Sequence, residues 1–150
     1  MIARGPVTMA FSALLATATG IPVGRGRKPD GNHHRYYLLH SLPAVYSGAP
    51  FSDLNEDASF VYQLTPVSAP DPTRPDSYGV ADQAEWMADK GREVAYGRDP
   101  ATGLWLHQLV IPGAKVMGRG PDSSEPGGSS DPADAIMSYV QRFRFDLTSA

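Results

Sequence analysis

Hydrophobic residues between positions 77 and 97 recur at intervals of three and four, which predicts an amphipathic helix. Ser77 or Asp76 is expected to cap its first turn, and Gly97 to take the left-handed conformation that ends its last turn. Because several apolar residues of this helix are alanine or glycine, its buried face is shallow and suits packing flat on a sheet. The residues of that face are Val80, Ala84, Met87, Ala88, Gly91, Val94 and Ala95.

Five further elements are predicted around this helix. Apolar residues at helical spacing predict a first helix over residues 6–20, which begins at a proline and ends at a glycine. Runs rich in aromatic and β-branched residues predict strands over 34–42, 59–68, 104–111 and 136–147. The order is helix, strand, strand, helix, strand, strand. We therefore expect an α+β two-layer sandwich, in which a mainly antiparallel four-stranded sheet has the helices packed on one face.

We expect a single domain over residues 1–150, because this length is usual for one domain with its own core. Its 15 glycines and 14 prolines gather mainly in long loops, at 20–33, 66–77 and 112–135. Long loops on a small core commonly contact a partner. The expected core consists of Leu14, Leu15, Leu38, Phe60, Tyr62, Leu64, Ala84, Met87, Val94, Leu106, Val110, Phe143 and Phe145.

The formal net charge of −3 argues against a general nucleic-acid binder, which would be markedly basic. Cysteine is absent, which excludes disulfides, thiolate metal sites and cysteine nucleophiles. Near the start of the chain, an apolar run after Arg4 is interrupted by threonine and serine. It is too short and too polar to span a membrane, so we interpret it as the first helix, with a secretion signal as the alternative.

The residues that could support catalysis or metal binding form no recognisable motif. Four histidines, at 33, 34, 40 and 107, lack the spacing of a metal site, and no GxSxG motif occurs. Acidic residues fall on expected solvated surfaces. We therefore predict no catalytic residue, metal site or cofactor. A small metal-dependent hydrolase remains as a distant alternative, and it would require a bound metal or a pocket that joins His40 and His107.

The last predicted strand carries arginine and phenylalanine in alternation. Phe143 and Phe145 point to one face, and Arg142 and Arg144 to the other. Such a strand closes a core on one side, while its other side meets either an acidic surface or solvent. Arg142 and Arg144 are therefore candidate interface residues.

Two further regions hold candidate interface residues. Trp105, like Trp86, belongs either to the core or to an interface, where tryptophan is enriched. Arg25, Arg27 and Lys28 lie in a glycine-containing basic loop without a phosphate-binding motif. This loop is interpreted as flexible, and it could face DNA or an acidic neighbour.

Five segments in this order resemble those of a known family: ATGIPVGRGRKPDG, RYYLLHSLP, LNEDASFVYQLTPVS, ADQAEWMADKGREV and YVQRFRFDL. The chain resembles, over nearly its whole length, the tail terminator proteins of long-tailed, non-contractile (siphovirus-type) bacteriophages, especially those that infect actinobacteria. The helix DQAEWMAD after the strand VYQLTPVS is the most specific part of the match. The chain departs from the family pattern at the long connection over 66–76 and the excursion over 117–132.

The resemblance implies a non-enzymatic α+β subunit that forms a homohexameric ring on the tail tube. Such a ring stops polymerisation of the major tail tube protein and joins the tail to the head–tail connector or stopper protein. It implies a place in the tail or neck of the virion, after assembly in the host cytoplasm, without a membrane. We then expect Arg142, Arg144 and Trp105 at subunit or tube contacts. The loop of Arg25, Arg27 and Lys28 would lie near the tube or the lumen, and so near DNA. Another phage neck or head-completion adaptor remains the alternative.

Overall fold

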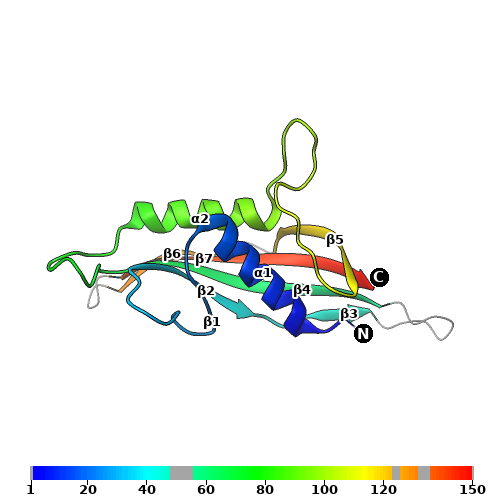
Figure 1. Ribbon diagram of the computed structural model, residues 1–150, viewed down its shortest axis with the longest axis horizontal. Helices are drawn as coiled ribbons and strands as arrows, with labels where there is room; N and C mark the ends of the chain where they lie inside the picture. The colour runs from blue at the N-terminus through cyan, green and yellow to red at the C-terminus, as the bar shows by residue number, and fades with distance from the viewer. Residues whose placement is uncertain (1, 48–55, 123–125, 132–135, 150) are drawn as a thin grey trace.

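The computed structural model describes residues 2–47, 56–122, 126–131 and 136–149. Figure 1 shows an elongated sheet against which the helices pack. In chain order the elements are α1 (Arg4–Thr19), β1 (Val23–Arg25), β2 (Arg35–Ser41), β3 (Val45–Ser47), β4 (Asp57–Ser68), α2 (Ala81–Tyr96), β5 (Ala114–Pro121), β6 (Gly127–Asp131) and β7 (Ile136–Ser149).

The predicted four-stranded sheet with helices packed on one face is wrong, because the structure is a mixed sheet of seven strands with two helices. The strand order is β1-β2-β4-β7-β5, with β3 also paired to β4 and β6 also paired to β7. β1 runs parallel to β2, and the other pairings are antiparallel. The additional strands β1, β3 and β6 are three to five residues long, so they carry too little alternation to be predicted.

The long strand β7 accounts for much of this difference. It pairs with β4 along one edge, while β6 and then β5 occupy successive parts of its other edge (Figure 1). Phe60 lies opposite Phe145, and Tyr62 lies opposite Phe143. Directly opposite residues of an antiparallel pair share a face, so these aromatic rings form one apolar surface, here called the core face.

The predicted strand over residues 104–111 is wrong. This segment contains only isolated bridges. In this part of the chain, the strand that pairs with β7 is β5, which begins after Pro112 and Gly113. Gly113 has a φ of 77°, a left-handed conformation that lets the chain reverse before β5. As a result the predicted core residues Leu106 and Val110 are 44% and 75% exposed, whereas their neighbours Leu109 and Ile111 are buried.

Two predicted loops also contain strands. β1 lies within 20–33, and β5 and β6 lie within 112–135. Residues 123–125 and 132–135 of the latter loop are outside the described residues. β4 continues through Pro66 to Ser68, so the loop predicted over 66–77 begins later than expected. Pro66 pairs with Tyr37 of β2, and the ladder to β7 has no partner at this position, where proline lacks an N–H to donate.

Both helices contribute to the core through the residues that their spacing predicts. Phe11 of α1 packs its ring edge-on against Phe145 at a centroid distance of 4.8 Å. On α2, the predicted face is confirmed except for Val80, which is 44% exposed. An added Cβ at Gly91 would lie 2.7 Å from Leu64 Cδ2 of β4, so this glycine allows a close approach of helix and sheet. Most of the other predicted core residues are buried, and Leu14 and Leu38 are partly buried.

The predicted cap of α2 is wrong. Val80 occupies the N-cap position without a side-chain cap, and its N–H donates instead to Ser68 Oγ at the end of β4. Ser68 Oγ in turn donates to Gln83 Oε1 at 2.6 Å. Gly97 ends the helix in an extended conformation with a φ of −64°, rather than a left-handed one.

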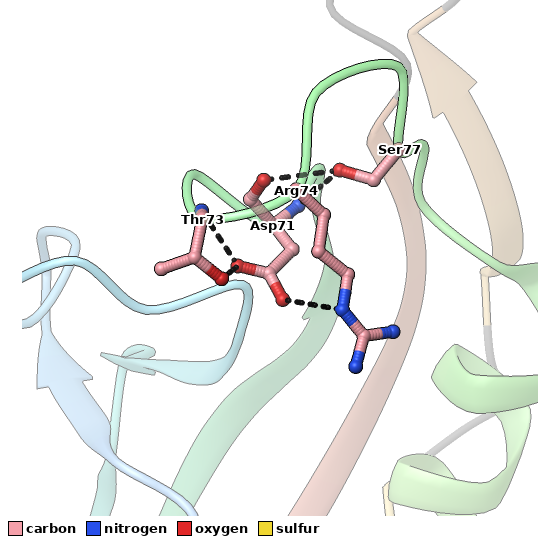
Figure 2. Close-up of polar contacts among 4 residues, drawn as sticks. All are labelled: Asp71, Thr73, Arg74 and Ser77. Atoms are coloured by element: carbon pink, nitrogen blue, oxygen red, sulfur yellow. Dashed lines mark hydrogen bonds and ion pairs between the residues drawn. The ribbon is translucent and has the colours of Figure 1, made fainter.

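Ser77 stabilises the preceding loop instead of capping the helix. Asp71 N–H donates to Ser77 Oγ at 2.8 Å, and Ser77 Oγ donates to the Asp71 carbonyl oxygen at 3.0 Å (Figure 2). The Asp71 carboxylate accepts hydrogen bonds from the side chain and the backbone N–H of Thr73. These bonds, with a smaller contribution from the charges of His34 and Arg74, lower the pKa of Asp71.

Candidate functional site

The six candidate residues fall into three regions that the structure does not bring together. Arg25, Arg27 and Lys28 lie at β1 and the loop after it, at one edge of the sheet. Arg142 and Arg144 lie on β7, three strands away in the sheet order. Trp105 lies in the segment between α2 and β5. Trp105 contacts Arg119 of β5, which lies opposite Phe145 and so faces the core side of the sheet. Trp105 is therefore not on the same face as the two β7 arginines.

The two β7 arginines lie on the face of β4 and β7 opposite to the core face, here called the outer face. Phe143 and Phe145 are 0% and 1% exposed, which confirms the predicted alternation. Arg142 lies opposite Gln63 of β4, and its Nε donates to Gln63 Oε1 at 3.4 Å. Arg142 forms no ion pair with a described residue. Its charge is therefore available to an external partner.

Arg144 belongs to a small polar network on the outer face. Its Nε lies 2.9 Å from Asp146 Oδ1, which also accepts a 2.6 Å hydrogen bond from Ser59 Oγ. Partial burial acts to raise the pKa of Asp146, but the hydrogen bonds from Ser59 and Arg144 and the charge of Arg144 outweigh it, so this pKa is lowered. The network fixes a carboxylate and a guanidinium side by side.

A shallow hollow of about 510 Å³ adjoins this network. Ser59, Arg144 and Asp146 line it together with the exposed apolar residues Val45 and Met117, which are each 68% exposed. The outer face thus combines paired charges with exposed apolar side chains.

The basic loop folds back on β1. Gly24 is buried, and an added Cβ there would lie 1.9 Å from the Arg27 carbonyl oxygen, so the loop requires glycine at this position. Arg27 forms an exposed ion pair with Asp30 at 3.6 Å, and Lys28 Nζ lies 5.5 Å from the centre of the Tyr36 ring. Arg25 is exposed at the end of β1. The loop therefore presents cations at the sheet edge.

The segment over residues 97–113, here called the arm, projects beyond the C-terminal end of α2 (Figure 1). Trp105 lies in its base between two guanidinium groups. Arg98 Cζ lies 4.2 Å and Arg119 Cζ 5.0 Å from the centre of the Trp105 ring. Arg119 Nη1 also donates to the His107 carbonyl oxygen at 2.7 Å. Trp105 therefore holds the arm against β5 as a cation–π sandwich.

The two arginines of this sandwich were not predicted as site residues. Arg98 lies in a turn and Arg119 in a glycine-rich segment, and the sequence gives no signal that joins them to Trp105. Partial burial lowers the pKa of Arg119, but its guanidinium remains a cation at neutral pH. Neither arginine forms an ion pair within the described part of the chain. The arm also exposes Leu104 (69%), Leu106 (44%) and Val110 (75%).

The described residues contain no group of three or more histidine, aspartate or glutamate side chains that could hold a metal ion. His40 lies on β2, whereas His107 lies in the arm. No helix within the described ranges is long and apolar enough to cross a membrane. No protein-family model and no curated protein sequence matches this chain.

Proposed function

We propose that this protein is a structural, non-enzymatic subunit of a homohexameric ring at the end of the tail tube of a long-tailed, non-contractile bacteriophage. The ring stops polymerisation of the tail tube protein and joins the tail to the head–tail connector. It is assembled in the host cytoplasm and remains in the tail or neck of the virion.

The observation that carries this proposal is the presence of two chemically different surfaces on one subunit. The outer face combines the Arg144–Asp146 pair with Arg142, which forms no ion pair with a described residue, whereas the arm exposes apolar side chains beside Arg98 and Trp105. Subunit contacts in a closed ring join two different surfaces, and a terminator must also accept one partner and refuse another. The resemblance of the five sequence segments to tail terminator proteins supplies the identity of these partners.

Native mass spectrometry of the purified protein tests the ring. A hexamer is expected, either alone or after addition of purified tail tubes, whose ends can template it. Loss of the protein from an infecting phage is expected to give tails that exceed their normal length. Tails of normal length would contradict the proposal. Binding to a portal-side protein instead of tube protein would identify a head-completion adaptor.

The double variant Arg142→Ala/Arg144→Ala tests the outer face. It is expected to weaken ring or tube association while the circular dichroism spectrum stays that of the folded protein. The matched control is Arg4→Ala/Arg74→Ala, which removes the same charge from two other exposed positions. Equal assembly of both double variants would show that the two β7 arginines do not contribute to the interface.

A further inference from the structure

A groove runs between α2 and the strands β6 and β7. Its first part is a hollow of about 250 Å³, lined by Ala81, Ala84, Glu85 and Met137 among others. Its second part is a hollow of about 220 Å³, whose lining includes Glu85, Asp89 and Arg92. Both hollows include Glu85 in their lining, so they adjoin, and together they are here called the groove. The groove is thus mainly apolar near the N-terminal end of α2 and carries charged side chains further along the helix.

Glu85 is an exposed carboxylate of this groove, and it forms no ion pair with any residue that the structure describes. Asp89 by contrast lies 3.3 Å from Arg92 Nη2. A ligand of the groove would therefore carry apolar side chains for the first hollow and a cation for Glu85.

The arm has this composition. Leu104, Leu106 and Val110 are exposed, and Arg98 presents an exposed guanidinium that forms no ion pair among the described residues. The Trp105 sandwich and the hydrogen bond from Arg119 to the His107 carbonyl oxygen hold these side chains in place. Ordering the arm before binding reduces the entropy that association would otherwise cost.

An arm and a groove of the same subunit are kept apart by α2. The arm begins after the C-terminal end of this helix (Figure 1). The apolar part of the groove lies at its N-terminal end, beside Ala81 and Ala84. A helix of 16 residues is about 24 Å long at 1.5 Å per residue. The complementary surfaces therefore suit a contact between two copies of the chain.

From this complementarity we infer that the arm of one subunit docks in the groove between α2 and β6–β7 of the next copy. Its leucine and valine side chains enter the hollow beside Ala81 and Ala84, and its Arg98 pairs with Glu85. Such a contact is heterologous, because arm and groove are different surfaces, and its repetition closes a ring. The inference rests on the proposed function and names the surfaces that join the subunits.

Disulfide crosslinking tests this contact, because the chain contains no cysteine and each introduced thiol is unique. Leu104→Cys labels the arm and Ala81→Cys labels the groove, both at exposed positions. A mixture of the two variants is expected to give covalent dimers on oxidation, while each variant alone gives none. The double variant is expected to give a ladder that ends at the closed ring. Met9→Cys, at an exposed position of α1, replaces Ala81→Cys in the control mixture and is expected to give no crosslink.

The crosslinking is carried out at concentrations where native mass spectrometry detects oligomers, or with purified tail tubes if the protein alone is monomeric. A ring without crosslinks above the control would overturn the arm contact and leave the proposed ring intact. Efficient crosslinking of Leu104→Cys with itself would also overturn it, since that result indicates an arm-to-arm contact. Absence of a ring under both conditions would instead contradict the proposed function.

Charge exchange gives a second readout. Arg98→Glu and Glu85→Arg are each expected to weaken self-association by roughly tenfold, as for other close interfacial charge pairs. The combined variant is expected to recover the part of this loss that comes from the charge pair, because it restores opposite charges, whereas the contact of Arg98 with Trp105 stays lost. Circular dichroism verifies that each variant is folded. Additive losses in the combined variant would show that these two residues do not meet.

Discussion

The phenol of Tyr37 on β2 donates a 2.6 Å hydrogen bond to the carbonyl oxygen of Met87 in the middle of α2. Gln141 Nε2 on β7 donates at 2.8 Å to the carbonyl oxygen of the next helix residue, Ala88. Two strands thus anchor consecutive residues of one helix. Because α2 forms a wall of the groove and leads into the arm, these bonds position both proposed contact surfaces.

Replacement of Tyr37 by phenylalanine is expected to lower the free energy of unfolding by about 1 kcal/mol, the usual net value of one hydrogen bond. The aromatic ring stays buried, so the change isolates the bond to Met87. Urea unfolding followed by circular dichroism measures it. Tyr78→Phe is the matched control, because Tyr78 is 70% exposed. An equal effect of the two substitutions would mean that the bond contributes nothing to stability.

Tyr37 is expected to make the protein less stable at alkaline pH. Burial is the main cause that raises the pKa of Tyr37 above its ordinary value of 10.0, against an opposing effect of the Arg35 charge. In the unfolded chain the phenol loses its proton first. A rise in pH above about 10 therefore favours unfolding. The urea concentration at the unfolding midpoint is measured between pH 8 and pH 11. As the pH rises, it is expected to fall less steeply in Tyr37→Phe than in the unmodified protein.

Gly91→Ala is expected to destabilise the protein by about 1 kcal/mol. Alanine favours a helix by about 1 kcal/mol, but overpacking of a filled core costs about 1–3 kcal/mol. The new Cβ would lie 2.7 Å from Leu64 Cδ2, and Leu64 is fully buried, so it has no free space to move into. Thermal unfolding measures the change.

Two further variants separate crowding from helix propensity at this position. Gly5→Ala in α1 adds a Cβ that meets nothing within 4 Å, so it is expected to be neutral or stabilising. Leu64→Val removes one carbon from the crowded side chain. It is expected to cost less stability in the Gly91→Ala background than alone. If Gly91→Ala and Gly5→Ala change the stability by the same amount, α2 does not approach β4 as closely as the distance from Gly91 to Leu64 indicates.

Trp105→Ala is expected to loosen the arm without unfolding the domain. The ring contacts two guanidinium groups, and each cation–π contact at a partly exposed site contributes about 0.5–1 kcal/mol. Hydrogen exchange of residues 98–107 is therefore expected to accelerate by roughly fivefold to thirtyfold. Exchange in β4 and β7 serves as the internal control. Acceleration there as well would show that Trp105 supports the core.

The residue patterns that were predicted correctly are local and periodic. The buried face of α2 follows from the spacing of its alanines, Met87 and Val94, and the two faces of β7 follow from its alternating arginine and phenylalanine residues. Helical and strand periods determine which side chains can share a face. Neither pattern requires knowledge of distant contacts.

The features that were missed depend on pairing partners. β6 has the sequence GGSSD, which has low strand propensity, and it forms a strand along the free edge that β7 offers. Leu104 to Ile111 reads as a strand by composition, but the reversal at Gly113 places β5, rather than this segment, beside β7. The Trp105 sandwich likewise joins residues from three places in the sequence, so no local pattern predicts it.

Ser59→Ala is expected to raise the pKa of Asp146 toward its ordinary value. Partial burial already acts in that direction, and the substitution removes one of the two hydrogen bonds that hold the pKa down. Because the folded-state pKa of Asp146 is depressed, its stabilising contribution is present above the unfolded pKa and is lost as the pH falls. Carbon-detected NMR of the Asp146 carboxyl group between pH 2 and pH 6 measures the shift directly. An unchanged titration in Ser59→Ala would mean that Arg144 alone sets this pKa, and the outer-face network would then reduce to a single ion pair.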